Sequence, residues 1–188
     1  MMQLIKFPEK HQWASILKRP VFDNTALVGT VQSVLGAVKI EGDAAVKKYT
    51  AQFDGVEINE ILVTEAEIAT AMALVSKELK AAIIQAVANI RQFHDNQLAP
   101  VEVIETMPGV KCWRKSVGIE KVGLYIPGGS APLFSTILML GVPAQIAGCK
   151  EIVLCSPPNK SGELHPAILF AAQLVGITKI YKIFNLYF

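Results

Sequence analysis

The sequence predicts an α/β protein in which a helical N-terminal region and a β-hairpin precede an incomplete parallel α/β domain. Three observations support this prediction. Apolar residues recur at helical spacing up to about residue 97. After Pro100, β-branched residues become frequent on both sides of a turn at Pro108 and Gly109. From residue 121 onward, apolar strand-like runs alternate with helical segments, which favours a parallel sheet with right-handed crossovers.

The first part of the chain carries start and stop signals for helices. We interpret residues 1–20 as an N-terminal extension. A capping residue at Asn24 or Thr25 starts the first helix. Gly42 ends that helix, and Asp43 caps the next one. The first helix has these apolar residues at helical spacing: Leu27, Val28, Val31, Val34, Leu35 and Val38.

Two more helices follow a turn in the segment FDGV and a short strand predicted at 58–63. Thr64 and Glu67 match a capping box, which starts the first of these helices. The second, from Lys77 to about Gln97, is long and amphipathic. Its apolar face includes Leu79, Ile83, Ala86, Ile90 and Phe93.

The rest of the chain predicts a hairpin and then a parallel α/β unit. Residues 101–106 pair with residues 110–115 across the Pro-Gly turn. The later segments are strand 121–126, helix 133–147, strand 151–155, helix 164–175 and strand 178–183. This order implies a parallel sheet whose strands are joined by crossover helices. We therefore divide the chain into an extension (1–20), a helical region with the hairpin (21–118) and a parallel α/β domain (119–188), which the family resemblance given below implies is an incomplete Rossmann-like domain.

Composition narrows the class of protein. Hydrophobic residues make up 52% of the 188 residues and charged residues 18%, which excludes a disordered chain. The net charge of +2 predicts neither a nucleic-acid nor a membrane partner. Three cysteines with irregular spacing argue against a disulfide framework and fit a reducing cytosol. The N-terminus has no continuous apolar stretch of the kind that a signal peptide needs.

The turn YIPGGSAP is the candidate ligand site. Gly128 and Gly129 follow a buried strand and let a ligand approach the main chain. Ser130 lies near the N-cap position and Pro132 at the first position of the next helix, whose free N–H groups suit a phosphate. A GxGxxG fingerprint is absent, so a tight turn without a ligand is the alternative. Tyr125 ends the strand where its ring can lie against an adenine or a ribose, or pack in the core as an ordinary buried tyrosine.

The titratable residues predict no catalytic centre in this chain. His11, His94 and His165 stand far apart and lack metal-binding spacing, so surface or capping roles are expected. Cys149 and Cys155 fall at a helix end and in a strand, where they suit small apolar core positions. We therefore predict no catalytic residue and no metal ligand.

One long segment gives the sequence a family resemblance. The run VGLYIPGGSAPLFSTILMLGVPAQIAGCKEIVLCSPP closely resembles the signature region of the histidinol dehydrogenase family. The upstream segments EGDAAVKKYTAQFDGV, NIRQFHDNQ and PGVKCWRKSVGIEKVGLYIPGG are similar to its N-terminal half. The resemblance extends from about Arg19 to Ile180 without large gaps.

The resemblance implies a fold, an activity and a site. It implies two incomplete Rossmann-like domains, as in the aldehyde-dehydrogenase-like group, in an intertwined homodimer of the cytoplasm. It also implies oxidation of L-histidinol to L-histidine by two hydride transfers to NAD, with a bound zinc, in histidine biosynthesis. Tyr125 falls on an NAD-contacting tyrosine of the family, and Pro127, Gly128 and Gly129 match the same motif and form the nearby wall of an NAD-binding domain.

The chain departs from the family pattern near its last residues. After GITKIYK the sequence continues IFNLYF, where the family has a glycine- and alanine-rich segment. The resemblance implies that the family's Glu-His catalytic pair and its zinc ligands lie beyond this point, so we expect the 188-residue chain alone to be inactive. Two alternatives stay open: a stand-alone nucleotide-binding module, or a non-functional remnant whose last strand has an unpaired edge and an apolar tail that aggregates.

Overall fold

The computed structural model describes residues 4–19, 25–128 and 131–184. The helices are α1 (Trp13–Ile16), α2 (Thr25–Glu41), α3 (Asp43–Tyr49), α4 (Glu65–Leu74), α5 (Lys77–Asp95), α6 (Phe134–Ile146) and α7 (Pro166–Leu174). The strands are β1 (Val103–Met107), β2 (Val110–Trp113), β3 (Lys121–Tyr125), β4 (Glu151–Ser156) and β5 (Lys179–Lys182). A 3-10 turn (Lys10–Gln12) precedes α1, and a π-helical turn (Thr50–Asp54) follows α3. No helix in the described ranges is both long and apolar enough to cross a membrane.

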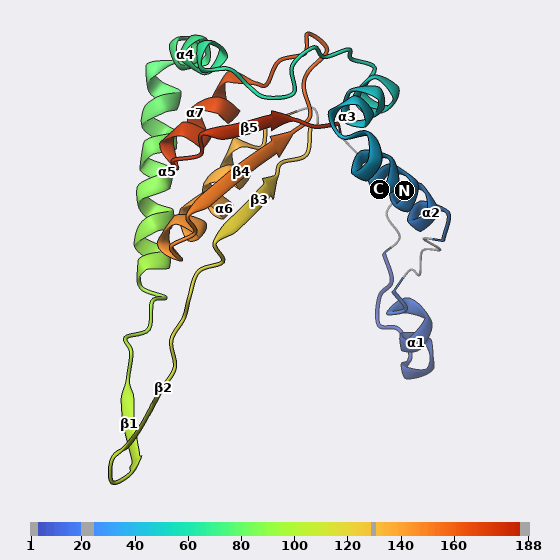
Figure 1. Cartoon of the computed structure of the whole chain (residues 1–188). Helices are drawn as coiled ribbons and strands as arrows, with labels where there is room; N and C mark the ends of the chain where they lie inside the picture. The colour runs from blue at the N-terminus through green and yellow to red at the C-terminus, as the bar shows by residue number, and fades with distance from the viewer. Residues whose placement is uncertain (1–3, 20–24, 129–130, 185–188) are drawn as a thin grey trace.

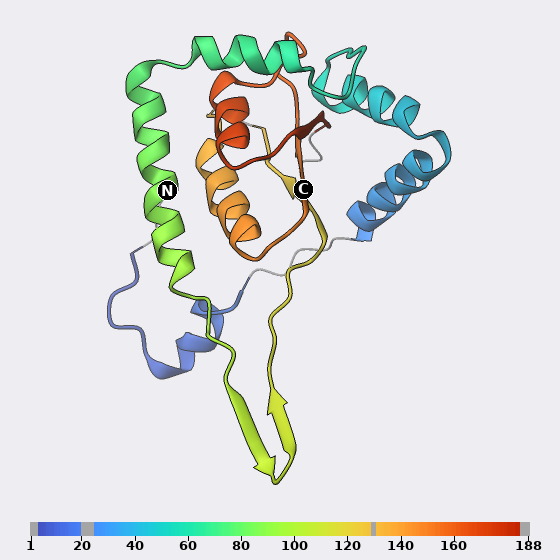
Figure 2. The same ribbon diagram turned by 60° about the vertical axis from the view of Figure 1, so that its left-hand side comes forward.

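A parallel three-stranded sheet forms the centre of the fold, in the order β3–β4–β5. Helices α6 and α7 lie on one face of the sheet, and α5 packs outside them (Figures 1 and 2). Every second strand residue points at these helices. Leu124, Leu154 and Ile180 are therefore buried in the large core cluster. We call β3–β5 with α5–α7 the α/β body; its alternating order confirms the predicted α/β class.

The outer edge of β5 is paired, contrary to the alternative of a remnant whose last strand has an unpaired edge. Leu62 forms an antiparallel bridge with Tyr181. The Val63 amide donates to the Ile180 carbonyl at 2.9 Å, and the Lys182 amide donates to the Ile61 carbonyl at 2.7 Å. Residues 61–63 thus satisfy backbone groups that would otherwise face solvent. Of the short strand predicted at 58–63, residues 61–63 pair with β5 in this way.

Helix α4 begins at the predicted capping box and is tied to β5. The Thr64 hydroxyl accepts from the Glu67 amide at 3.2 Å, while the Glu67 carboxylate accepts from the Thr64 amide at 2.8 Å. The same carboxylate forms an ion pair with Lys182, whose side chain is only 9% exposed. Desolvation is the largest single influence on Glu67 and raises its pKa, but the hydrogen bonds from Lys182 and Thr64 together outweigh it and lower the pKa.

A second, smaller core joins α2 and α3 to the segments before α4 and after β5. It contains Val34, Val46, Val56, Ile58, Ile61 and Phe184. Most of α2 is exposed, and Val28 and Leu35 of the predicted apolar set are 51% and 64% exposed. Gly42, at φ 58°, is the N-cap of α3, so Asp43 is the first helical residue rather than the predicted cap. A left-handed backbone at this position favours glycine over aspartate.

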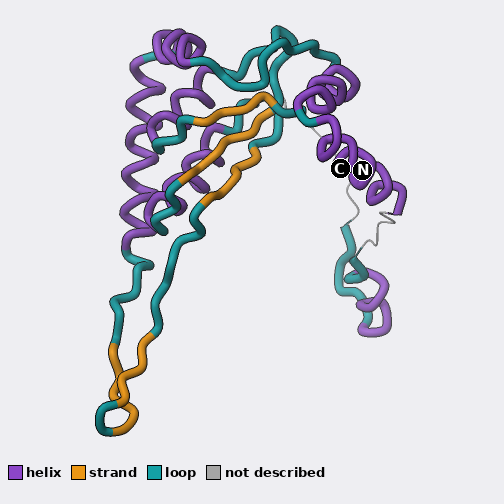
Figure 3. Tube along the Cα trace, viewed as in Figure 1, coloured by secondary structure: helices purple, strands orange, loops and turns teal. Residues whose placement is uncertain are grey.

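The predicted hairpin extends away from the α/β body as an arm, which we define as residues 98–119 (Figures 1 and 2). Val103 faces Trp113 and Glu105 faces Lys111 across the two strands. Every residue of β1 and β2 is exposed. Figure 3 shows that strands form only near the tip and that the two legs are irregular. The arm therefore places apolar side chains in solvent.

Candidate functional site

Tyr125 lies at the carboxyl end of β3, where ligands bind in open parallel α/β sheets. Its side chain is 43% exposed, so Tyr125 is not the buried core tyrosine of the alternative interpretation. The hydroxyl donates to the Phe184 carbonyl at 3.5 Å, the long limit for a hydrogen bond. The next residue, Ile126, is fully buried, and its amide donates to the Cys155 carbonyl at 2.9 Å. The backbone of the strand end is therefore anchored while the tyrosine ring faces outward.

Tyr125 belongs to a row across the three strands on the face of the sheet opposite α6 and α7. Cys155 is its register partner on β4, and Tyr181 is the register partner of Cys155 on β5. Burial raises the pKa of the Cys155 thiol, which keeps it protonated near neutral pH. Cys155 therefore suits a packing role better than a nucleophilic one.

The other end of the same face is charged. Glu151 pairs with Lys179 at 2.8 Å and with Lys121 at 3.4 Å. The hydrogen bond from Lys179, followed by the charge of Lys121, lowers the pKa of Glu151, and the same bond raises the pKa of Lys179. These charges lie at the amino ends of the strands, so they are separated from Tyr125 by the length of β3.

The turn after β3 is described in part. Pro127 is exposed and Gly128 is half-buried, while Gly129 and Ser130 lie outside the described residues. Helix α6 begins at Phe134, with Leu133 as a cap that provides no side-chain hydrogen bond. The prediction of Pro132 as the first helical residue is wrong, because the first helical bond joins the Thr136 amide to the Leu133 carbonyl. The free N–H groups of α6 are therefore further along the chain from Gly128 than the sequence indicated.

Ser156 is a part of this edge that sequence reasoning missed. Its side chain is 1% exposed, and the hydroxyl donates to the Ile126 carbonyl at 3.0 Å. Its own carbonyl accepts from the Ile183 amide at 3.0 Å. Ser156 thus joins all three strands where they end. The only signal in the sequence is a serine directly before two prolines, which is too common in loops to be diagnostic.

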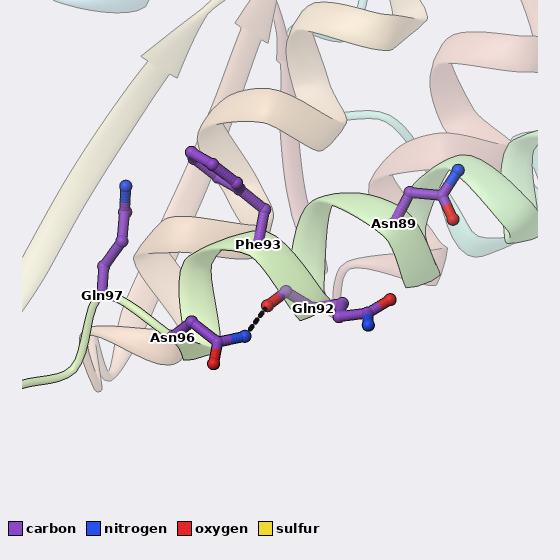
Figure 4. A pocket seen from close by; sticks show the side chains of 5 residues that line it. All are labelled: Asn89, Gln92, Phe93, Asn96 and Gln97. Carbon is purple, nitrogen blue, oxygen red and sulfur yellow. Dashed lines mark hydrogen bonds between the residues drawn. The ribbon is translucent and has the colours of Figure 1, made fainter.

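Cavities occur away from Tyr125. One, of about 560 Å³, is lined by Asn89, Gln92, Phe93, Asn96 and Gln97. Asn89, Gln92 and Phe93 lie in the last turns of α5, Asn96 and Gln97 follow directly after it, and Figure 4 shows the five side chains pointing in different directions. Phe93, on the predicted apolar face of the helix, is 65% exposed there, whereas Ile83 and Ile90 of the same face belong to the large core cluster or pack against it. Side chains that diverge from one convex helix cannot enclose a ligand.

The histidines occupy separate places. His11 lies in the exposed N-terminal segment beside Glu9, at 3.2 Å. His94 lies in the last turn of α5, where its Nδ1 is 2.7 Å from the Gln97 amide oxygen. His165 is the N-cap of α7 and accepts from the Ala167 amide at 3.1 Å. In the part of the chain that the structure describes, no three His, Cys, Asp or Glu side chains come together as a metal site would need.

The sheet and its carboxyl edge define the class of fold. The parallel sheet β3–β4–β5, with two helices on one face and Tyr125 exposed at the carboxyl end of β3, is an incomplete Rossmann-like α/β unit.

The comparisons identify the family. The family model described as histidinol dehydrogenase matches residues 17–184, and the chain belongs to this family. It is 58% identical to the histidinol dehydrogenase of Bacteroides thetaiotaomicron over 182 residues, which is 97% of this chain and 42% of that protein. It is 47% identical to that of Salmonella typhimurium over 173 residues.

A solved structure supports the same assignment. The crystal structure of histidinol dehydrogenase from Elizabethkingia anophelis superposes with a TM-score of 0.88 at 49% identity, covering 94% of this chain and 41% of that one. The chain thus spans about two fifths of the length of the relatives it matches. The resemblance found in the sequence is confirmed.

Proposed function

We propose that this chain is the N-terminal part of an oxidoreductase that converts L-histidinol to L-histidine in histidine biosynthesis. The family match over residues 17–184 and the 0.88 TM-score support this proposal. The chain spans only part of the length of its relatives. We therefore propose this activity for the longer protein of which the chain is a part. The division into residues 1–20, 21–118 and 119–188 is proposed with it.

We propose that Tyr125, Pro127, Gly128 and Gly129 contribute to NAD binding. The observation that carries this proposal is the exposed ring of Tyr125 at the carboxyl end of β3. An aromatic ring offers a stacking surface for an adenine, and the adjacent glycines let the cofactor approach the main chain. NAD, when bound, supplies the acceptor for hydride.

Zinc fits the described residues poorly. Within residues 4–19, 25–128 and 131–184 the histidines and cysteines form no cluster with three converging donors, the minimum for a zinc site. We expect the purified 188-residue chain to show no histidinol-dependent NADH formation, with or without added zinc, and a normal turnover rate in that assay would refute the expectation.

The partners and the location are proposed from the family. L-histidinol is the proposed substrate, and a homodimer is the proposed assembly of the longer protein. The thiols of Cys112, Cys149 and Cys155 are free, which supports a reducing compartment such as the cytoplasm.

Titration of NAD by calorimetry tests the cofactor proposal. We expect Tyr125→Ala to weaken NAD binding about 5- to 10-fold, because one aromatic stacking contact contributes about 1 kcal/mol. Tyr125→Phe keeps the ring and should keep most of the affinity. The matched control is Phe93→Ala, which removes an exposed ring from α5, away from the sheet edge.

Two results would count against the proposal. Equal affinity in the wild type, Tyr125→Ala and Phe93→Ala would show that NAD binds without Tyr125. An absence of binding heat in all proteins, with folding confirmed by circular dichroism, would leave the sheet edge with a structural role only.

A further inference from the structure

A groove lies between α4 and the start of α7, apart from the Tyr125 edge. We call it the α4–α7 groove, and its volume is about 300 Å³, at the lower end of the range for small-molecule sites. Its lining comes from α4, from the loop before α7 and from the first turns of α7. The polar residues among those that line it are Glu67, Thr70, Asn159, Glu163 and His165.

The floor of the groove is apolar and well packed. Ala71, Leu164 and Leu169 are 3%, 5% and 3% exposed, and all three belong to the large core cluster. Leu74 on the rim is 67% exposed. Helix α4 packs against α7 and lies above it in both views of the fold (Figures 1 and 2). The floor is therefore an apolar surface, fixed by core packing, against which an aliphatic group can lie.

The two carboxylates of the groove differ in what they already bind. Both oxygens of Glu67 are occupied, one by Lys182 and the other by Thr64. Glu163 has no ion-pair partner within the described ranges. No lysine or arginine is among the residues that line the groove. The free negative charge of the groove is therefore that of Glu163.

The loop that carries Glu163 is held in place by its own hydrogen bonds. The Asn159 side-chain oxygen accepts from the Ser161 amide at 2.9 Å and from the Glu163 amide at 3.0 Å. The Asn159 amide donates to the Glu163 carbonyl at 2.8 Å. Gly162 turns the loop at φ 79°. Because this backbone is already ordered, less conformational entropy is lost when Glu163 binds a partner.

We propose that the α4–α7 groove binds a small organic cation, a primary ammonium that carries a short aliphatic group. The ammonium lies against the Glu163 carboxylate, and the aliphatic group rests on Ala71, Leu164 and Leu169. An amine is favoured over an alcohol or an acid because the free charge of the groove is negative and no fixed cation lines it. This proposal does not depend on the proposed NAD site, because the two share no residue.

Chemical-shift titration of the 188-residue chain with three probes of one shape tests the proposal. The probes are isoamylamine, isoamyl alcohol and isovalerate, which are cationic, neutral and anionic at pH 7. We expect isoamylamine to bind with a millimolar dissociation constant and to shift the signals of groove residues. The alcohol should bind several-fold more weakly, and the acid more weakly still, because an exposed ion pair contributes only modestly.

Variants separate the charge from the shape of the groove. Glu163→Gln should weaken isoamylamine binding about 3- to 5-fold and leave the alcohol unaffected. The matched control is Glu60→Gln, which removes a carboxylate from the neighbouring cavity rather than from this groove and should change nothing. Ala66→Met on the exposed rim should block all three probes, since a longer side chain then fills the space.

Specific outcomes would overturn the proposal. They are equal binding of the amine and the alcohol, equal loss in Glu163→Gln and Glu60→Gln, and no saturable shift of groove signals with millimolar amine. The amide spectrum of each variant shows whether it is folded, so a folded Glu163→Gln protein with unchanged amine affinity would also reject the role of Glu163.

Discussion

The α/β body and the arm use similar apolar residues in opposite ways. In the body, Leu154 and Ile180 are fully buried between the sheet and its helices. In the arm, Ile104 and Trp113 are 56% and 59% exposed. Both regions nevertheless form the elements that their sequence patterns predict. A local pattern therefore specifies a strand or a helix, whereas the burial of that element depends on which other elements the fold packs against it.

The largest effect should come from a core truncation in the body. Leu154→Ala leaves a cavity beneath α6 and α7 and should lower the free energy of unfolding by about 3 kcal/mol. Ile104→Ala in the arm should change it by less than about 0.5 kcal/mol. Urea unfolding followed by circular dichroism measures both. Similar losses in the two variants would mean that the arm is buried in solution as the body is.

The ion pair between α4 and β5 should give the next largest effect. Glu67→Gln should lower the free energy of unfolding at pH 7 by about 2 kcal/mol, because Lys182 stays buried without its partner while Glu67 itself is 32% exposed.

The same pair gives the wild type an acid sensitivity. Since the folded pKa of Glu67 lies below its ordinary 4.5, its contribution is present above that value and is lost as the pH falls through the folded pKa. Urea midpoints between about pH 5 and about pH 3 should therefore converge for the wild type and Glu67→Gln. A constant gap over that range would contradict this assignment.

Two helical glycines, one in the core and one on the surface, should differ in how they tolerate an added methyl group. An added Cβ at Gly141 in α6 would lie 2.7 Å from Cγ2 of Val175, which is fully buried. Gly141→Ala should therefore lower the free energy of unfolding by about 1 kcal/mol, since overpacking exceeds the gain in helix propensity. Thermal unfolding measures the change. A higher melting temperature would show that the side chain of Val175 moves aside at little cost.

The smallest effect has the opposite sign. Nothing lies within 4 Å of an added Cβ at Gly36, on the exposed part of α2. Gly36→Ala should stabilise α2 by about 0.5–1 kcal/mol, because alanine restricts the unfolded chain and favours helix. Far-ultraviolet circular dichroism should show a small rise in helix content. A loss of helix would indicate that this face of α2 has a partner in solution.

Much of the fold was predictable because its signals are local. The capping box at Thr64, the turn at Gly109 and the strand–helix alternation after residue 121 need only neighbouring residues, and the structure confirms them. The pairing of residues 61–63 with β5 and the exposure of Phe93 depend on distant partners. No periodicity within one segment carries that information.

The candidate site was predictable in position but not in detail. A strand followed by paired glycines located Tyr125 at the carboxyl edge of a parallel sheet. Ser156 joins that edge through bonds to the residues at 126 and 183, which converge only when three strands align. The start of α6 shifted because Leu133, rather than a polar residue near Ser130, provides the first carbonyl of the helix.

Glu67 has a consequence for the order of assembly. Its bond to Thr64 spans three residues, whereas its bond to Lys182 spans 115. The first can form as soon as the local turn forms, and the second only after nearly the whole chain is available. During synthesis, α4 can therefore form early, but it can pack against β5 only late. A nascent chain that stalls before residue 182 would carry a helix without its anchor, open to proteases and chaperones.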